Sequence, residues 1–391
     1  MSEVVESVKD ETAARRSPTG ESQARAGAVL RDEGGAQVAA HYGDARAEYE
    51  AVRGGVGAGL FDLSERGRVE VSGSEAVQFL NGLVTNDVKT LAPGAWMGAA
   101  FPNVQGRLVA HARVMRAGDD QTFLIDTEGA TAEVVRRSLE RFTLAGDFRV
   151  RDLGADYALL SVQGAAAASL VGRVLGEDAA ATGRGRVSVV GRRDSLPVTV
   201  ARATHTGEDG FDLFAGRDAA RQLWDALAAA GARPAGHDAL ELLRVEAGVP
   251  RHGVDVTDAN VVTEAGLEDS VSYTKGCYVG QEIIARIHWR GHVAKRLAGL
   301  LPEGDVDAGA TLKTPDGARE VGRVTSVARS PRLGRVIALG LVKYDFLQPG
   351  TELIVAAGES GESGETRARV APLPFVRGGW HADADGAETQ S

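Results

Sequence analysis

The spacing of hydrophobic residues changes along this chain, and each spacing predicts a different kind of element. Residues 74–83 have apolar side chains every three or four positions after a serine, which predicts an amphipathic helix with Ser74 as its N-cap. Residues 122–126 form a short apolar run that is typical of a buried strand. A second amphipathic helix should follow, because three apolar residues recur at helical spacing, Val135, Leu139 and Phe142.

Two more helices are predicted before residue 250. The first begins at Asp218, presents apolar residues to a core, and ends at Gly231, a residue typical of helix C-termini. The second covers residues 239–247 with Asp238 as its cap, and its apolar stripe includes Arg244. Because helical and strand-like spacings are intermixed, the pattern indicates an α+β fold.

From about residue 290 onward, short strand-like stretches are separated by turns. Residues 321–327, 336–342 and 352–355 are rich in β-branched and other apolar residues, and the turn at residues 330–334 contains proline and glycine. This pattern predicts a small β-barrel at residues 291–371. The preceding residues 41–290 would form two subdomains.

Both ends of the chain differ in composition from the region between them. Residues 1–40 and 372–391 are polar, charged and rich in glycine, so burial would not offset the entropy of ordering them. We therefore expect two disordered tails, with the function carried by residues 41–371.

Composition limits the kinds of partner. The chain has 44 basic and 54 acidic residues and a net charge of -10, so we expect no direct nucleic-acid partner. It has neither an apolar leader segment nor the roughly 20 consecutive apolar residues that a membrane helix needs, so we expect a cytoplasmic protein without a membrane partner. Its single cysteine excludes an intrachain disulfide and any metal or cluster cage built from this chain's thiolates alone.

Two charged residues of the central region could bind a ligand. Arg244 lies on an apolar stripe, and a buried guanidinium requires an anionic or carbonyl partner, which is either a protein group or a ligand. Glu208 lies in a glycine-flanked acidic turn that leads into a strand. A carboxylate at the mouth of a strand can accept two parallel hydrogen bonds from a planar donor pair, although the same pattern is typical of a solvated hairpin tip.

The third candidate is the segment 273–292, which contains Cys277 and several polar residues. A thiol close to Lys275 on a glycine-flanked turn could have a lowered pKa and hold more of the reactive thiolate. The alternative is a cysteine that packs as a small buried hydrophobic residue.

Four segments resemble, in order, the landmarks of the glycine-cleavage T-protein superfamily: residues 59–64, 79–87, 206–211 and 243–248. Residues 275–282, Lys-Gly-Cys-Tyr-Val-Gly-Gln-Glu, are similar to the short signature of its YgfZ branch. Members of that branch are folate-binding factors for the maturation of iron–sulfur proteins.

The resemblance implies a cloverleaf of three subdomains around a central folate channel, with tetrahydrofolate or a one-carbon derivative as the ligand. Glu208 and Arg244 match residues that contact folate in T-proteins. Further candidates for folate contact are Asn103, Gln281 and Arg286. Cys277 and Lys275 are the candidate catalytic residues, and no resident metal site is expected. Cys277 would act either as a transient ligand of an iron–sulfur cluster or as a redox nucleophile that protects cluster intermediates. Iron–sulfur client or scaffold proteins would be the partners.

One departure from the family pattern affects the expected activity. Aminomethyltransferases have two aspartates, one of them catalytic, where this chain has Ala110 and His111. The resemblance therefore predicts a folate-binding accessory protein for iron–sulfur cluster assembly or repair, and not a classical aminomethyltransferase. Two alternatives stay open: a tetrahydrofolate-dependent aminomethyltransferase or demethylase that uses His111 or Asp87 as its acid, and an accessory protein of tRNA modification.

Overall fold

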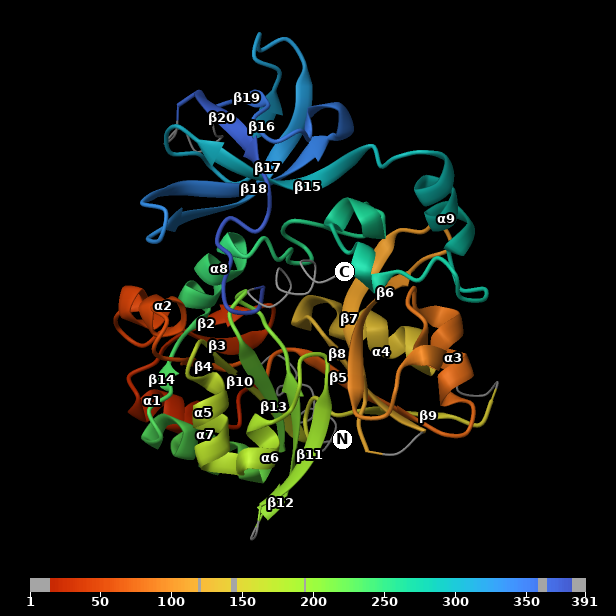
Figure 1. Ribbon diagram of the computed structural model, residues 1–391, viewed down its shortest axis with the longest axis vertical. Coiled ribbons are helices and arrows are strands. Elements are labelled where there is room, and N and C mark those ends of the chain that lie inside the picture. Colours follow the sequence, from red (N-terminus) through yellow and green to blue (C-terminus); the bar gives the residue numbers. More distant parts are fainter. Residues whose placement is uncertain (1–14, 119–120, 142–145, 193–194, 358–363, 382–391) are drawn as a thin grey trace, which may run out of the picture.

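The computed structural model describes residues 15–118, 121–141, 146–192, 195–357 and 364–381. These residues form a part built on a six-stranded sheet, a part built on a five-stranded sheet, and a closed barrel, which surround a common junction (Figure 1). The predicted α+β fold with a C-terminal β-barrel is confirmed. None of the helices in the described ranges is long and apolar enough to cross a membrane.

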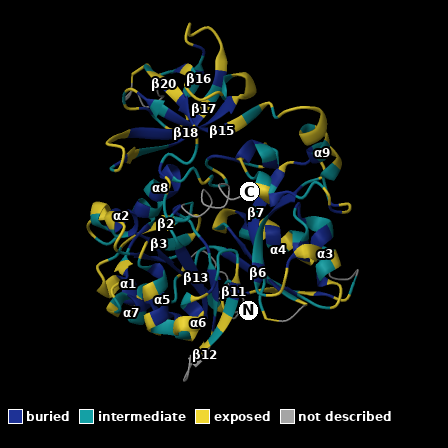
Figure 2. Cartoon of the chain, viewed as in Figure 1, coloured by how far each residue is buried: buried dark blue, intermediate teal, exposed yellow. Residues whose placement is uncertain are grey.

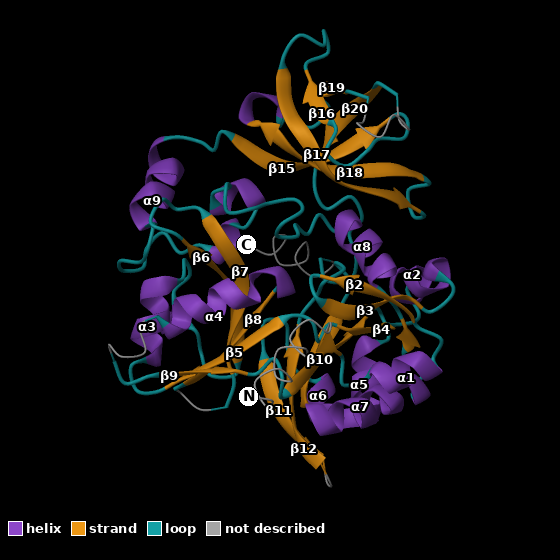
Figure 3. Cartoon of the chain, turned by 180° about the vertical axis from the view of Figure 1, so that it is seen from behind, coloured by secondary structure: helices purple, strands orange, loops and turns teal. Residues whose placement is uncertain are grey.

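The six-stranded part has the strand order β11-β12-β13-β10-β4-β14. Alternate strand residues pack against α5 and α7, which lie side by side on one face of the sheet, as Figure 3 shows from behind. The opposite face packs against the five-stranded part through a second apolar cluster. The elements are β4 (Gly59–Asp62), β10 (Tyr157–Gln163), β11 (Val187–Arg192), β12 (Ser195–Arg202), β13 (Gly210–Gly216), β14 (Arg233–Pro234), α5 (Ala167–Leu175), α6 (Glu177–Ala180) and α7 (Arg217–Ala229).

The five-stranded part has the order β6-β7-β8-β5-β9, and α3 and α4 cover one face of its sheet. Its elements are β5 (Gly67–Ser72), β6 (Ala95–Pro102), β7 (Leu108–Arg116), β8 (Thr122–Thr127), β9 (Arg149–Asp152), α3 (Ala76–Leu83) and α4 (Ala132–Glu140). Short 3₁₀ turns flank it at η1 (Val88–Thr90), η2 (Gly129–Thr131), η3 (Val262–Ala265) and η4 (Glu268–Ser270). The strand predicted at residues 122–126 is confirmed, and so is the helix that carries Val135 and Leu139; Phe142 lies outside the described residues.

The barrel closes in the order β15-β18-β17-β16-β19-β20. Its strands are β15 (Lys295–Pro302), β16 (Thr311–Lys313), β17 (Glu320–Ser330), β18 (Arg335–Lys343), β19 (Glu352–Val355) and β20 (Thr366–Ala371), with η5 (Tyr344–Phe346) after β18. Helix α8 (His237–Glu246) packs against β17 of the barrel, α2 (Ala45–Arg53) packs against α8, and α9 (Gln281–Arg290) precedes the barrel. Figure 2 shows that α9 exposes much of its surface, whereas the sheets are largely buried.

The segment 15–40 is ordered, which corrects the expectation of a disordered tail there; residues 1–14 lie outside the described residues. It forms β1 (Arg15–Arg16), α1 (Gly20–Arg25), β2 (Val29–Glu33) and β3 (Ala36–His41). Side chains of Ser17, Thr19 and Gln23 donate hydrogen bonds to Asp62 of β4. The segment buries only a short apolar run, Val38, Ala39 and Ala40, and its contacts with Asp62 are polar. A search for longer apolar patterns therefore missed it.

Two predicted helix caps are wrong. The N-cap of α3 is Glu75 and makes no side-chain capping bond, while Ser74 donates to Asp147 instead. Helix α8 begins at His237, and Asp238 in its first turn pairs with Arg31 of β2. In both cases the polar side chain found a partner distant in sequence, which local patterns cannot reveal.

Candidate functional site

Glu208 lies at the mouth of β13, as the sequence predicted. Its turn requires Gly207, whose φ of +78° is in the left-handed region that favours glycine. One oxygen of Glu208 accepts a hydrogen bond from Nη1 of Arg53 at 2.7 Å, and the other accepts from the main-chain N–H of Gly379 at 2.7 Å. The side chain is only 13% exposed, so this carboxylate is not a solvated hairpin tip.

Arg53 of α2 connects Glu208 to a second buried carboxylate. Its Nε donates to Glu246 at 3.1 Å and its Nη2 to the carbonyl of Thr206 at 2.9 Å. Glu246 also accepts hydrogen bonds from Tyr49 of α2 and Ser330 of β17. The guanidinium therefore fixes the position of Glu208 and supplies the positive charge that its burial requires.

Arg244 is held by protein groups. Its five N–H groups donate to Glu241, Asp255, Ser326 Oγ and the carbonyl of Val249. A guanidinium has five donors, so every donor has a protein acceptor. Of the two interpretations left open by the sequence, the structure therefore favours the ion pair, and the expected contact between Arg244 and folate finds no support in the geometry.

A chain of buried charges crosses the interface between the two sheets, and the sequence did not reveal it. Asp126 of β8 accepts from Arg66 and from Arg113 of β7, and Arg113 also donates to Asp212 of β13. Burial alone would raise the pKa of Asp212, but the charge of Arg113 and the contact with His205 outweigh it, so this pKa lies below its usual range. Asp126, Arg113 and Asp212 could have been found from the sequence, because each is a charged residue within an otherwise apolar strand.

His205 ends this chain of charges, three residues before Glu208. Its Nε2 lies 2.9 Å from the buried carboxylate of Asp212, and its side chain is 17% exposed. The preceding Thr204 and the following Thr206 share the side-chain oxygen of Gln163, which fixes the backbone of the turn. The turn thus carries a histidine that pairs with a buried carboxylate, three residues before Glu208 in the chain.

The two residues that replace the family aspartates lie on opposite faces of β7. Ala110 is fully buried in the core of the five-stranded part. His111 faces the other way and contacts Ser270 Oγ through Nε2 at 2.9 Å. Burial, aided by the charges of Arg66 and Arg113, lowers the pKa of His111 to about 4, so this ring is neutral at pH 7. The other proposed acid, Asp87, caps η1 by accepting from the N–H of Lys89.

Lys275 is a structural residue of the Cys277 loop, defined here as residues 274–280. Its ammonium donates to the carbonyls of Asn81, Val84 and Asn86 at 2.6 to 2.8 Å. Burial lowers the pKa of Lys275 to about 8. All three donors serve carbonyls at the end of α3, so the structure does not support the expectation that this lysine activates the thiol.

Cys277 is a free thiol with an exposed side chain, so the alternative of a buried cysteine is wrong. It lies between two buried residues, Lys275 and Tyr278. No cluster of three or more histidine, cysteine, aspartate or glutamate residues suited to a metal occurs among the described residues. The thiol is therefore presented to solvent by a fixed loop.

The remaining predicted folate contacts lie near this loop. Gly280, with a φ of +76°, is so close to the carbonyl of Asn103 that a Cβ there would come within 2.4 Å of it. The side chain of Asn103 closes its own turn, and Gln281 donates to the carbonyl of Lys275 at 3.4 Å. Arg286 is exposed on α9, and Figure 1 shows this helix at the outer edge of the five-stranded part. The structure therefore does not bring these residues to Glu208.

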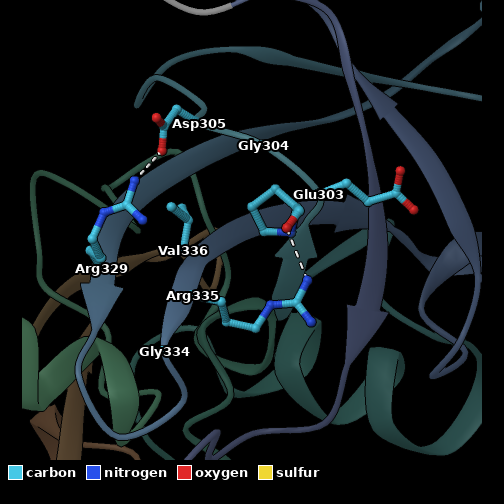
Figure 4. A pocket seen from close by; sticks show the side chains of 8 residues that line it. Glu303, Gly304, Asp305, Arg329, Gly334, Arg335 and Val336 are labelled. Atoms are coloured by element: carbon cyan, nitrogen blue, oxygen red, sulfur yellow. Dashed lines mark hydrogen bonds and ion pairs between the residues drawn. The ribbon is translucent and has the colours of Figure 1, made fainter.

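A cavity of about 450 Å³ lies on the barrel, at the turn between β17 and β18 (Figure 4). Its arginines are already paired, since Arg329 donates to Asp305 at 2.6 Å and Arg335 to the carbonyl of Pro302 at 3.0 Å. None of the predicted site residues lines it. The cavity is therefore separate from the site at the Glu208 turn.

Comparisons with known proteins agree with this architecture. Residues 20–275 match the GCVT N-terminal domain, and residues 295–377 match the glycine cleavage T-protein C-terminal barrel domain. An aminomethyltransferase of Rubrobacter xylanophilus is 35% identical over 364 residues, which covers 93% of this chain and 94% of the relative. An aminomethyltransferase of Streptomyces coelicolor is 31% identical over 373 residues, covering 94% of this chain and 98% of the relative.

A solved structure gives the same result. The crystal structure of glycine cleavage system aminomethyltransferase T from Bartonella henselae superposes with a TM-score of 0.83 at 25% identity, covering 93% of this chain and 98% of the other. Both the sequence and the three-part architecture thus match over nearly the whole length. The chain belongs to the glycine cleavage T-protein family.

Proposed function

We propose that this protein binds tetrahydrofolate at the Glu208 turn and transfers a one-carbon unit to or from it, as an aminomethyltransferase or a related demethylase. The observation that carries this proposal is the Glu208 carboxylate, which Arg53 holds at a strand mouth with its second oxygen accepting from a main-chain N–H. An aminopyrimidinone ring offers N–H donors of the same kind to a carboxylate.

The relatives support this function ahead of the iron–sulfur accessory function that the sequence first predicted. The two relatives described above are aminomethyltransferases and align over more than 90% of this chain. The YgfZ branch has no comparable support, since it rests on the octapeptide alone. The aminomethyltransferase alternative is therefore the better supported of the two.

One-carbon transfer also needs a group that takes up a proton, and Ala110 and His111 do not supply a carboxylate. His205 fits this need. Its Nε2 contacts the ionised carboxylate of Asp212, which favours the tautomer with the proton on Nε2 and leaves Nδ1 to accept another. We assign His205 as the base and Asp212 as the residue that orients it.

The test is a calorimetric titration with tetrahydrofolate of the wild type, Glu208→Gln and the control Glu320→Gln on the exposed edge of the barrel. We expect at least a tenfold weaker affinity for Glu208→Gln, because the amide loses the charge and one acceptor. Incubation with tetrahydrofolate and an aminomethyl or N-methyl donor should accumulate methylene-tetrahydrofolate, and His205→Asn should lower this rate. Equal affinities in all three proteins would refute the assignment of Glu208.

One observation favours a second function, the assembly or repair of iron–sulfur clusters. Cys277 is exposed on a loop whose flanking residues are fixed by burial. A thiolate presented in this way could act as a transient cluster ligand with client or scaffold proteins. The test measures the activity of iron–sulfur enzymes in cells that carry either Cys277→Ser or Glu208→Gln. Loss with Cys277→Ser alone would favour this function over one-carbon transfer.

A further inference from the structure

The end of the described chain lies across the Glu208 turn. Residues 376–381, which we call the C-terminal strap, leave the barrel and descend past α8 (Figure 1, dark blue). The N–H of Val376 donates to the carbonyl of Glu246 at 3.1 Å, and the N–H of Trp380 donates to the carbonyl of Gly207 at 3.1 Å. Between them, Gly379 donates to Glu208. This contradicts the expectation of a disordered tail for residues 372–381, while residues 382–391 lie outside the described part.

The strap touches the carboxylate itself. A Cβ on Gly378 would come within 2.4 Å of the carbonyl oxygen of Gly207 and 2.6 Å of Cδ of Glu208. Glycine is therefore required at this position by the close approach of two main chains. A flat ligand cannot lie against the same face of Glu208 while Gly378 is there.

Arg184 holds the strap from the other side. Its guanidinium donates to the carbonyls of Gly379 at 2.8 Å and Trp380 at 3.0 Å. The same guanidinium lies 5.1 Å from the centre of the indole ring of Trp380, in a cation–π contact. The strap thus presents an N–H donor to a carboxylate and a flat aromatic ring to a guanidinium.

We propose that the C-terminal strap occupies the binding site of the ligand's flat ring, that ligand binding displaces it from Glu208, and that Arg184 then stacks on the ligand ring. The proposal rests on the folate function proposed above. A pterin ring offers what the strap offers, namely N–H donors for Glu208 and a flat π-system for Arg184. The strap and the ligand compete, so the apparent affinity of the full chain is reduced by the fraction of molecules in which the strap is bound.

The first experiment compares tetrahydrofolate binding by the full chain and a chain that ends at Arg377, both checked for an unchanged melting temperature. The family match ends at residue 377, so the shortened chain keeps the matched barrel. We expect the shortened chain to bind about tenfold more tightly. Gly378→Ala in the full chain should act in the same direction. Gly364→Ala is the matched control, because it lies outside the strap and an added Cβ there meets no atom within 4 Å.

The role of Arg184 is tested in the shortened chain, where the strap no longer uses it. Arg184→Ala should weaken tetrahydrofolate binding about fivefold there, in the range of one cation–π contact. The control is Arg186→Ala in the same loop, whose guanidinium donates to the carbonyl of Pro93. Equal binding by the two variants would overturn the assignment of Arg184.

Hydrogen exchange gives a readout that does not depend on affinity. The amides of Gly379 and Trp380 should be protected in the free full chain and should lose protection at saturating tetrahydrofolate. Retained protection, or equal or weaker binding by the shortened chain, would overturn the strap proposal while the folate function stands. Binding by neither chain would overturn both.

Discussion

The Glu208 turn and the Cys277 loop are the two places where the sequence predicts chemistry, and they are built in opposite ways. At the turn, the functional carboxylate is itself almost buried and both its oxygens have protein partners. At the loop, the neighbours Lys275 and Tyr278 are buried and the functional thiol is exposed. At the Glu208 turn, the functional group is therefore covered by other groups of the chain. At the Cys277 loop, the buried residues hold the loop in place and leave the functional group open to solvent.

The largest expected effect tests whether Arg244, which the sequence predicted beside Glu208 as a folate contact, is purely structural. Arg244→Ala should lower the free energy of unfolding by about 3–5 kcal/mol, because it leaves the carboxylate of Asp255 buried without its guanidinium. Urea denaturation measures this loss. The matched control is Arg296→Ala, an exposed pair partner of Glu268 that should cost about 1 kcal/mol or less. A small loss for Arg244→Ala with weaker folate binding would instead make this residue part of the ligand site.

The next largest effect concerns Lys275, the buried residue that anchors the Cys277 loop. Lys275→Met should lower the free energy of unfolding by about 3 kcal/mol, since three buried carbonyls lose their donor. Lys343→Met is the control, because that ammonium is exposed and donates to a single carbonyl. If the two variants were equally stable in urea, Lys275 would be available for chemistry, and the contrast between buried neighbours and an exposed thiol would fail.

The expected effect of His111, on β7, depends on pH. Its folded pKa of about 4 lies below the ordinary value near 6.5, so between these values the unfolded chain binds the proton and the folded chain does not. Stability contributed by the neutral ring is therefore present above pH 6.5 and is lost as pH falls toward 4. Between pH 7 and pH 5, the wild type should lose about 2 kcal/mol more unfolding free energy than His111→Gln. Parallel profiles for the two proteins would show that this histidine is solvated.

The smallest expected effect separates chemistry from packing at Cys277. Cys277→Ser should change the free energy of unfolding by less than about 0.5 kcal/mol, because the side chain is exposed. Its reaction with a small thiol reagent in the native wild type should be as fast as in the unfolded chain. Slow labelling that requires unfolding would show that the sulfur is not presented to solvent.

The parts of the fold that the sequence predicted are those that follow from apolar spacing. The helix of residues 217–229, the strand that begins at Thr122 and the closed barrel are all visible as periodic burial. The missed features depend on polar partners far apart in the chain. The ordered N-terminal segment depends on Asp62, and the strap depends on Arg184 and Glu208. Such pairs leave no periodic trace in the sequence.

The candidate site was predicted only in part, because its polar partners are also far apart in the chain. Glu208 could be found because a short turn motif carries it, but its two partners, Arg53 and Gly379, lie about 155 and 171 residues away. For Arg244 and Lys275 the sequence identified unusual burial or position, yet it could not tell a protein acceptor from a ligand. The acceptor is identified only in the folded structure, where Arg244 contacts Asp255 and Lys275 contacts the carbonyls at the end of α3.

The carboxylate of Glu246 has a consequence for how the molecule unfolds. It belongs to α8, accepts from Tyr49 and Arg53 of α2, and accepts from Ser330 of the barrel. Detaching the barrel would therefore strip a donor from a charge that has no access to water. Val245 of α8 also packs among the barrel residues Leu297 and Ile337. The barrel and the body should therefore lose their structure together, as one cooperative unit.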